Sequence, residues 1–229
     1  LRAQGMGLIL DIVSNHMAVG GADNPWWLDL LEWGRRSPYA DFFDIQWHSP
    51  DPLLEGQLLL PFLSSDYGTV LKAGEIPLRF DAGQGAFYVE HYQHYFPINP
   101  ATYAPLLNAA NDPELSELAQ RFAVLDHYPQ AYERARQARA ELATLAQQTG
   151  IQRAIDHGLK QFDSRTPEGF ERLHELLERQ HYRLASWRTA GDDINWRRFF
   201  DINELGGLRV ERPTVFEATH GKIFELISE

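Results

Sequence analysis

An apolar run at residues 8–13, written LILDIV, is the first clear pattern along the chain. A continuous apolar run bounded by glycine and polar residues is typical of a strand that a parallel sheet buries on both faces. We therefore predict a buried strand over residues 7–13. Asp11 lies inside this run, and Asn15 and His16 follow it directly.

Two helices are predicted from their start signals. Asn24 and Pro25 are typical of a helix start and predict a short helix from Pro25 to about Gly34. Thr166 and Pro167 predict a second helix in the same way. The side chains expected on the inward faces of these helices are Trp26, Trp27, Leu30, Leu31, Trp33, Phe170, Leu173, Leu176 and Leu177.

The pattern is helical over residues 113–179, and one part of it is poor in large apolar side chains. Residues 129–148, written PQAYERARQARAELATLAQQ, carry mostly alanine at their apolar positions. Such a pattern favours a solvated helical arm over a core helix. A further helix is predicted from Pro213 onward by apolar residues at helical spacing.

Short apolar stretches broken by Pro and Gly occupy residues 41–98. They read FFDIQW, QLLLPFL, IPLRFD and AFYVEHY, and they predict a small antiparallel unit with long loops. A strand-like HYRLASW follows the second predicted helix. The order of elements therefore predicts an α/β chain in which a large insertion interrupts a βα pattern.

Both ends of the sequence resemble parts of larger elements. LRAQG at the start resembles the last turn of a helix closed by a glycine, and the final helical pattern carries no stop signal before Glu229. We therefore expect the sequence to be an internal segment of a longer protein. A complete domain with frayed ends is the alternative.

Composition and charge narrow the classes of partner. The chain has 229 residues, of which 44% are hydrophobic, and a net charge of −11, which disfavours nucleic acid as a partner. It has no cysteine, and therefore neither disulfides nor a thiolate metal site. The apolar runs are too short to cross a bilayer, so we expect a cytoplasmic protein without a membrane partner.

Asn15 and His16 are the first candidate functional residues. At the carboxyl end of a parallel barrel strand they would lie where such folds place their sites. Alternatively, they only close a turn after the strand. His91 and His94 are not predicted to bind a metal, because residues three apart on one strand point to opposite faces. Gly20 and Gly21 predict a turn.

Aromatic and charged residues alternate over residues 193–211. Aromatic faces cover the C–H surfaces of sugars, and charged groups bond their hydroxyls, so this segment suits a carbohydrate cleft. An aromatic core cluster with ion pairs at its rim is the alternative interpretation. The residues concerned are Trp196, Arg197, Arg198, Phe199, Phe200, Asp201 and Glu204.

The segment DIVSNH resembles the first signature region of the α-amylase superfamily. Together with NPWWLDLLEWG, FFDIQW, LLLPFL, HYFPINP, QHYRLASWR and INWRRFFDINELGGLRVE, it makes nearly the whole chain similar to the maltooligosyltrehalose synthase family. The resemblance implies part of a (β/α)8 TIM barrel around barrel strand three, with a large and mainly helical insertion that contains a small β element. On this reading residues 1–40 hold strand three and its helix.

The remaining boundaries implied by the resemblance divide the chain further. Residues 41–179 would form the insertion, β-rich over 41–98 and helical over 99–179. Residues 180–229 would return toward barrel strand four. An exposed strand taken from a barrel has unpaired edges, so we expect the isolated chain to dimerise or exchange strands.

The family resemblance implies a transglucosylation on a maltooligosaccharide or glucan substrate. Its members convert the reducing-end α-1,4 linkage into an α,α-1,1 linkage, which yields a maltooligosyl trehalose. Such chemistry uses one carboxylate as nucleophile and another as acid and base. A carbohydrate-binding or scaffolding module without catalysis, and an amylase-type hydrolase, are the alternatives.

The resemblance assigns substrate contacts but no catalytic carboxylate to this chain. His16 would contact the sugar with Asn15 beside it, and Asp11 would support the strand end. GGLRVE places Glu211 where the family nucleophile motif has aspartate, but it precedes strand four, so nucleophile and acid are expected beyond Glu229. No metal and no cofactor are expected. Further candidate sugar contacts are Tyr182, Trp187 and Arg197.

Overall fold

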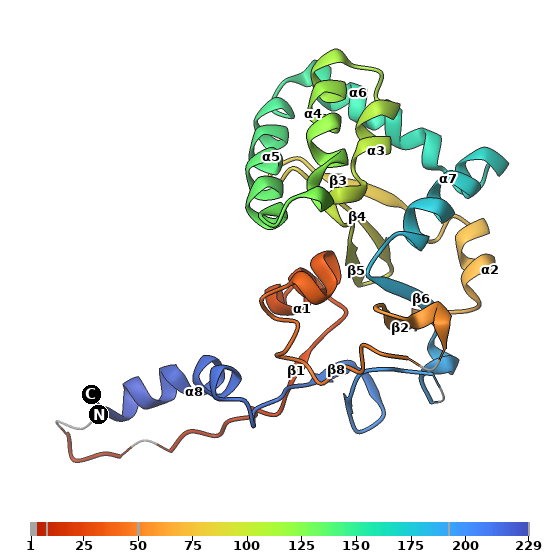
Figure 1. The fold of residues 1–229 in the computed structure, drawn as a ribbon. Helices are drawn as coiled ribbons and strands as arrows, with labels where there is room; N and C mark the ends of the chain where they lie inside the picture. The colour runs from red at the N-terminus through yellow and green to blue at the C-terminus, as the bar shows by residue number, and fades with distance from the viewer. Residues whose placement is uncertain (1–3, 8, 50, 192, 229) are drawn as a thin grey trace.

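The computed structural model describes residues 4–7, 9–49, 51–191 and 193–228. They form an elongated body of mixed helices and strands, from one end of which two terminal segments project (Figure 1). Helices α3 to α6 lie at the other end, above the strands β3 to β5, and α1 lies between these strands and β1. The helical part of the chain therefore lies far from its termini.

Within the described ranges, eight strands are arranged in three small sheets. Strands β1, β8 and β7 form an antiparallel sheet in that order, β2 pairs in parallel with β6, and β3, β4 and β5 form an antiparallel meander. Their bounds are β1 His16–Ala18, β2 Leu58–Leu63, β3 Leu78–Asp81, β4 Ala86–His91, β5 His94–Pro97, β6 Tyr182–Ser186, β7 Arg198–Phe199 and β8 Ile202–Gly207.

Eight α-helices accompany the strands among the described residues. They are α1 Pro25–Trp33, α2 Tyr67–Lys72, α3 Ala104–Ala109, α4 Pro113–Ala123, α5 Ala131–Leu145, α6 Thr149–Leu159, α7 Pro167–Glu178 and α8 Pro213–Ser228. Short 3-10 turns lie at Gly34–Arg36, Pro52–Leu54, Pro100–Thr102, Leu125–His127, Lys160–Phe162 and Trp187–Gly191. None of the helices described is both long and apolar enough to span a bilayer.

The two helices predicted from their start signals are present. The Asn24 side chain accepts a hydrogen bond from the Trp27 amide at the start of α1, and Thr166 accepts one from the Gly169 amide at the start of α7. Both caps satisfy amide groups that have no partner within a helix. The inward faces are also confirmed, since Trp27, Leu30, Leu31, Trp33, Leu173, Leu176 and Leu177 are buried while Trp26 and Phe170 are partly buried against the core.

The antiparallel unit predicted within residues 41–98 is confirmed by the β3–β4–β5 meander. The pairing of β2 is different, because this strand lies parallel to β6, with Leu58 opposite Tyr182. All six residues of β2 are buried. The FFDIQW stretch forms only isolated bridges, from Phe43 to Leu208 and from Ile45 to Trp196.

The helix α5 is not the solvated arm that its alanine-rich sequence suggested. Its buried face consists of Ala131, Ala135, Ala138 and Leu142, which belong to the main core. Alanine lets other backbones come close: Gly85, at φ +58°, packs so tightly that a Cβ there would lie 2.2 Å from the Arg139 carbonyl oxygen. Small side chains therefore bury this helix where large ones were expected to be needed.

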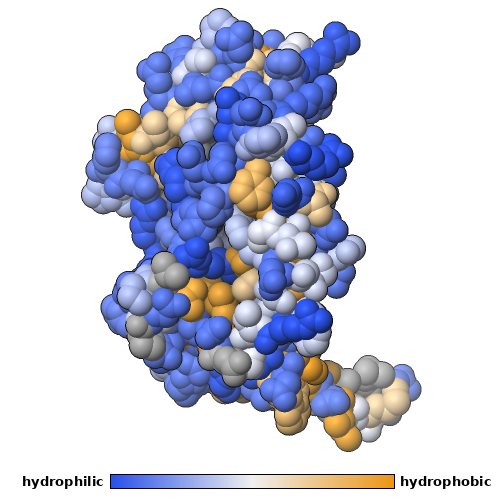
Figure 2. Space-filling model, turned by 90° about the vertical axis from the view of Figure 1, so that its right-hand side faces the viewer, coloured by the Kyte–Doolittle hydropathy of each residue, from blue (hydrophilic) through white to orange (hydrophobic). Residues whose placement is uncertain are grey.

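The strand predicted over residues 7–13 is absent from the described part of this segment: Gly7 and residues 9–13 form no strand, Ile9 is 97% exposed, and residue 8 lies outside the described residues. A buried parallel strand needs partners on both sides, and none of the described strands pairs with this segment. The predicted helix α8 is present, but among its side chains that the structure describes only Val215 is fully buried. Figure 2 shows apolar side chains gathered on the projecting part of the molecule.

Candidate functional site

The sheet β1–β8–β7 brings together the two stretches that the sequence marked as candidate sites. His16 in β1 lies opposite Gly207 in β8, and Arg198 in β7 lies opposite Gly206. The Leu208 amide donates to the Asn15 carbonyl oxygen over 2.9 Å. Residues near the start of the chain and residues near 200 therefore form one continuous surface.

His16 stacks on Phe199 at the centre of this surface. The ring centroids lie 3.8 Å apart with an interplanar angle of 17°. His16 Nδ1 lies 2.9 Å from Asn15 Oδ1, and because an amide oxygen only accepts, the contact favours a proton on Nδ1. Nε2, which has no hydrogen-bond partner among the described residues, is then an acceptor for a ligand hydroxyl.

Arg197 lies at the edge of the same sheet and is half-exposed. Its Nε donates to Asp44 over 2.9 Å, and its Nη2 donates to the Leu208 carbonyl oxygen over 2.9 Å. These two bonds hold the guanidinium group in place and leave Nη1 without a partner among the residues described. A group held in this way can donate to a neutral hydroxyl at little entropic cost.

The neighbouring Arg198 has a structural task. It donates to the Ala190 carbonyl oxygen, in the connection from β6 to β7, and to the Asn203 side chain of β8. Its side chain is largely buried, with 13% exposed. Arg198 therefore shapes the surface on which Phe199 is presented, and does not itself face a ligand.

The other candidate residues lie in three different settings. Trp187 is 54% exposed, with the Arg188 guanidinium carbon 5.2 Å from its ring centroid. Tyr182 is 1% exposed and donates its hydroxyl hydrogen to the Pro97 carbonyl oxygen, so it packs the core and offers no face to a ligand. Asp11 is exposed in the segment before β1 and bonds to no described residue, so it does not brace the strand end here.

The prediction that His91 and His94 point to opposite faces of one strand was wrong. The two histidines are not on one strand: a turn separates β4 from β5 and places them directly opposite each other in the register. Cross-strand partners share a face of the sheet, so both side chains are buried on the same side. The described residues contain no group of three or more His, Cys, Asp or Glu placed to hold a metal ion.

His94 is a residue that the sequence argument did not connect with the candidate site. Its ring packs against Phe62, with centroids 4.6 Å apart, and it approaches Gly20, which follows β1 closely. Burial lowers its pKa, and Glu204 of β8 opposes this shift. A turn prediction at Tyr92 and Gln93 would have identified the pairing, but neither residue is a typical turn former.

The groups on this surface are suited to binding a ligand. A stacked pair of rings, an imidazole acceptor and a held guanidinium group suit a ligand with hydroxyls and an apolar face. Two carboxylates near this surface are engaged: Asp44 bonds Arg197, and the exposed Glu211 accepts from Arg209 over 3.3 Å. Neither carboxylate is arranged as a free nucleophile or acid.

Comparison with known proteins gives consistent neighbours. No protein-family model matches the chain. A Mycobacterium tuberculosis protein assigned as a maltooligosyl trehalose synthase is 27% identical over 237 residues, which cover 100% of this chain and 19% of that protein.

Solved structures resemble the chain to a similar extent. The maltooligosyltrehalose synthase of Arthrobacter ramosus is 30% identical with a TM-score of 0.58, and the match covers 99% of this chain and 20% of that one. A glycosyltrehalose synthase is 25% identical with a TM-score of 0.56, over 97% of this chain and 21% of that one.

The chain thus spans about one fifth of the length of the relatives that it matches. The sequence comparison and the structure comparison both name maltooligosyltrehalose synthases. The resemblance to the maltooligosyltrehalose synthase family is therefore confirmed, and it extends over essentially this whole chain and about one fifth of each relative.

Proposed function

We propose that this chain forms part of the glucan-binding region of a maltooligosyl trehalose synthase. Such an enzyme converts the reducing-end α-1,4 linkage of a maltooligosaccharide into an α,α-1,1 linkage by intramolecular transglucosylation. The observation that carries the proposal is the His16–Phe199 stack, because it joins the DIVSNH segment to the aromatic segment near residue 200. The proposed activity belongs to trehalose biosynthesis in the cytoplasm.

The proposed sugar contacts follow from the geometry of the sheet. His16 Nε2 accepts a hydrogen bond from a sugar hydroxyl while Asn15 holds the ring by its Nδ1 contact. Arg197 donates to a second hydroxyl, and the exposed face of Trp187 offers a place for a sugar ring to stack. Substrate binding requires neither a metal nor a cofactor in this proposal.

We further propose that residues 7–13 become barrel strand three when the rest of a (β/α)8 barrel is present. The segment has the apolar sequence of a buried strand, and its apolar side chains at residues 9, 10, 12 and 13 are exposed here. On this proposal residues 1–40 belong to the barrel, residues 41–179 form an insertion, and residues 180–229 lead toward strand four. Asp11 would acquire its hydrogen-bond partners only in the assembled barrel.

Catalysis is proposed to need carboxylates that this chain does not supply. Retaining transfer uses a nucleophile and an acid–base group about 5–5.5 Å apart. The one segment that imitates a nucleophile motif, GGLRVE, ends in Glu211, which is exposed and bonded to Arg209. We therefore expect the isolated chain to bind maltooligosaccharides without turning them over.

A chimera tests the proposal directly. The chain replaces the matching fifth of the Arthrobacter ramosus synthase, and the isolated chain is assayed beside it. Incubation with maltopentaose is followed by loss of reducing ends and by release of glucose. We expect loss of reducing ends from the chimera alone, and a decrease of at least about tenfold on His16→Ala, because a lost charged or polar contact costs about 1.4 kcal/mol or more.

The matched control is His48→Ala, since His48 is exposed outside the candidate sheet. It is expected to leave the rate unchanged. Release of glucose in place of trehalose linkages would favour an amylase-type hydrolase. A chimera that folds and binds maltopentaose, but neither transfers nor hydrolyses, would favour a binding module.

A further inference from the structure

A polar cleft lies between α1, the turn from β3 to β4, and α5. It has a volume of about 350 Å³. We call it the α1–α5 cleft, and it lies on the far side of α1 from β1 (Figure 1). The residues that define it are Glu32, Gln84, Tyr132, Arg136, Arg139 and Ala140.

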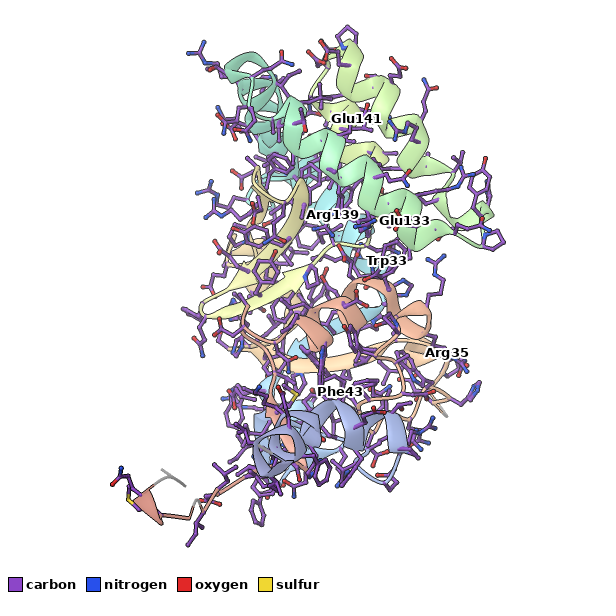
Figure 3. The ribbon with its side chains drawn as sticks, turned by 90° about the vertical axis from the view of Figure 1, so that its left-hand side faces the viewer. Trp33, Arg35, Phe43, Glu133, Arg139 and Glu141 are labelled. Atoms are coloured by element: carbon purple, nitrogen blue, oxygen red, sulfur yellow. The ribbon has the colours of Figure 1, made fainter. Side chains whose placement is uncertain are left out.

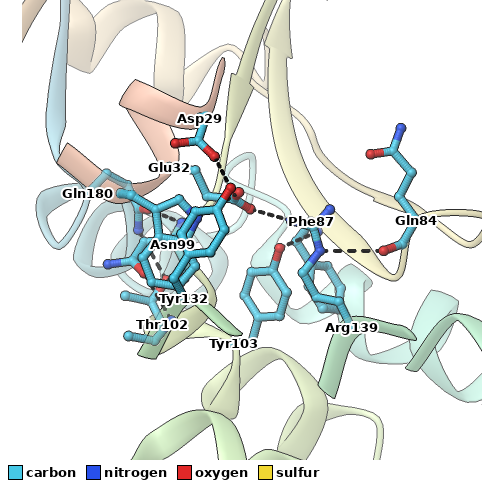
Figure 4. A network of polar contacts seen from close by, with 12 residues as sticks. Asp29, Glu32, Gln84, Phe87, Asn99, Thr102, Tyr103, Tyr132, Arg139 and Gln180 are labelled. Atoms are coloured by element: carbon cyan, nitrogen blue, oxygen red, sulfur yellow. Dashed lines mark hydrogen bonds and ion pairs between the residues drawn. The ribbon is translucent and has the colours of Figure 1, made fainter. Parts of the chain in front are cut away.

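The walls of this cleft are tied together before any ligand arrives. Arg139 Nη1 donates to Glu32 over 2.8 Å, and Tyr132 donates its hydroxyl hydrogen to Asp29 over 2.6 Å (Figure 4). Both bonds join α5 to α1, and Figure 3 shows Arg139 and Trp33 close together where these helices meet. Arg139 Nε also reaches the Gln84 carbonyl oxygen over 3.4 Å, which adds the β3–β4 turn.

The charges around the cleft are compensated within the protein. Arg139 pairs with Glu32, and Arg136 pairs with Glu133 through two hydrogen bonds of 3.0 and 2.9 Å. Each guanidinium group already has a carboxylate partner, so the cleft offers no unpaired charge that would attract an anion or a cation. The charge balance therefore favours a neutral ligand.

Hydrogen-bonding capacity nevertheless remains at the rim. Among the described residues, Arg139 Nη2, Arg136 Nη1 and the Gln84 side-chain amide have no partner, and Tyr132 Oη can still accept a hydrogen bond. The residues that carry these atoms come from α5 and from the β3–β4 turn, and they all line the cleft. A neutral ligand with several hydroxyls would use them, whereas a hydrocarbon would leave them without partners.

The rest of the lining is apolar and small. Ala135, Ala140 and Ala143 of α5 form one wall, and the Tyr132 side chain, 42% exposed, forms another. Sugar rings have this mixed character, with C–H groups on their faces and hydroxyls around their edges. A pyranose therefore matches both the apolar wall and the polar rim.

We propose that the α1–α5 cleft binds a neutral pyranose, and specifically a glucosyl unit of a maltooligosaccharide, at a place separate from His16. The choice of a glucosyl unit rests on the proposed function, whereas the choice of a pyranose rests on the cleft. The bound glucan would be held by Arg136, Arg139 and Gln84 at its hydroxyls. Such a cleft would keep a long maltooligosaccharide bound to the protein while the reducing end of the sugar lies at another site.

The test is an amide NMR titration of the chain with maltotriose. We expect millimolar affinity, about 1 mM, with saturating shifts of the Gln84 side-chain amide and the Gly83 backbone amide. Ala140→Phe fills the cleft from an exposed position and is expected to weaken binding at least tenfold. Gln84→Ala is a milder variant that keeps the test valid if the first one unfolds.

Two controls separate this proposal from the proposed function. Ala123→Phe places the same side chain on an exposed position of α4 outside the cleft and should leave the affinity unchanged. His16→Ala should leave the Gln84 shifts intact even where it abolishes transfer in the chimera. The proposal is overturned if maltotriose leaves Gln84 and Gly83 unshifted, if folded Ala140→Phe binds as well as the parent, or if inorganic phosphate alone shifts these amides.

Discussion

Two six-residue apolar runs of this chain have opposite fates. Residues 58–63, LLLPFL, form β2 and are buried throughout, beside β6. Residues 8–13, LILDIV, form no described strand, and Ile9 and Val13 are 97% and 67% exposed. The apolar pattern indicates that a segment can be buried. Whether it is buried depends on a partner strand elsewhere in the chain.

The same substitution in both runs is expected to have very different costs. Leu60→Ala removes a fully buried side chain and is expected to lower the free energy of unfolding by about 4 kcal/mol. Leu10→Ala, at a position 42% exposed, is expected to cost less than about 0.5 kcal/mol. Urea unfolding measures both, and equal costs would show that residues 8–13 are buried in solution.

A second prediction concerns a buried group of the body, Glu32, which lies against Arg139, Asp29 and Trp33. Burial raises its pKa to about 7 from 4.5, although Arg139 opposes the shift. Between these values the folded protein holds more protons than the unfolded chain. The free energy of unfolding therefore falls as pH rises through this interval, by about 3 kcal/mol in total.

Glu32→Gln should remove that decrease, because the amide does not titrate. Urea unfolding at a series of pH values measures the difference between the two proteins. Glu117→Gln, on the exposed face of α4, is the matched control and should keep the slope. If the slope of Glu32→Gln is the same as that of the parent, the pKa of Glu32 is the same in the folded and unfolded protein and the prediction fails.

The smallest effect is expected in the terminal segment, where exposed apolar side chains favour self-association. We expect dimers of the isolated chain to increase with concentration, and Ile9→Ser to weaken them about tenfold, which corresponds to about 1.4 kcal/mol. Val124→Ser changes an exposed apolar side chain outside the terminal segments and should have no effect on the dimers. Sedimentation equilibrium decides, and a strict monomer would contradict the prediction.

Local signals made part of this fold predictable. Asn24 and Thr166 cap α1 and α7 through contacts with residues three positions away, so the sequence nearby contains all the information needed. The β3–β4–β5 meander is equally local. Helix α5 was misjudged because an amphipathic pattern was sought, whereas its burial depends on close approach by alanine and by Gly85.

The candidate site was predictable in composition but not in geometry. His16 and the segment around Phe199 were both identified, yet nothing in either segment specifies that their rings stack. Tyr182 looked like a sugar platform, and only the fold shows that its hydroxyl bonds Pro97 inside the core. The α1–α5 cleft depends on contacts between residues more than a hundred positions apart, such as Glu32 and Arg139, which are 107 positions apart.

The pairing of β2 with β6 also has a kinetic consequence. Next to this pair, the Gln57 side-chain amide donates a hydrogen bond to the Gln180 carbonyl oxygen, 123 positions away along the chain. Bringing such distant residues together has an entropic cost. The meander and the helices between these strands make contacts over much shorter separations. We therefore expect the intervening segment to fold first and to carry β6 to β2, so that closure of this parallel pair limits the folding rate.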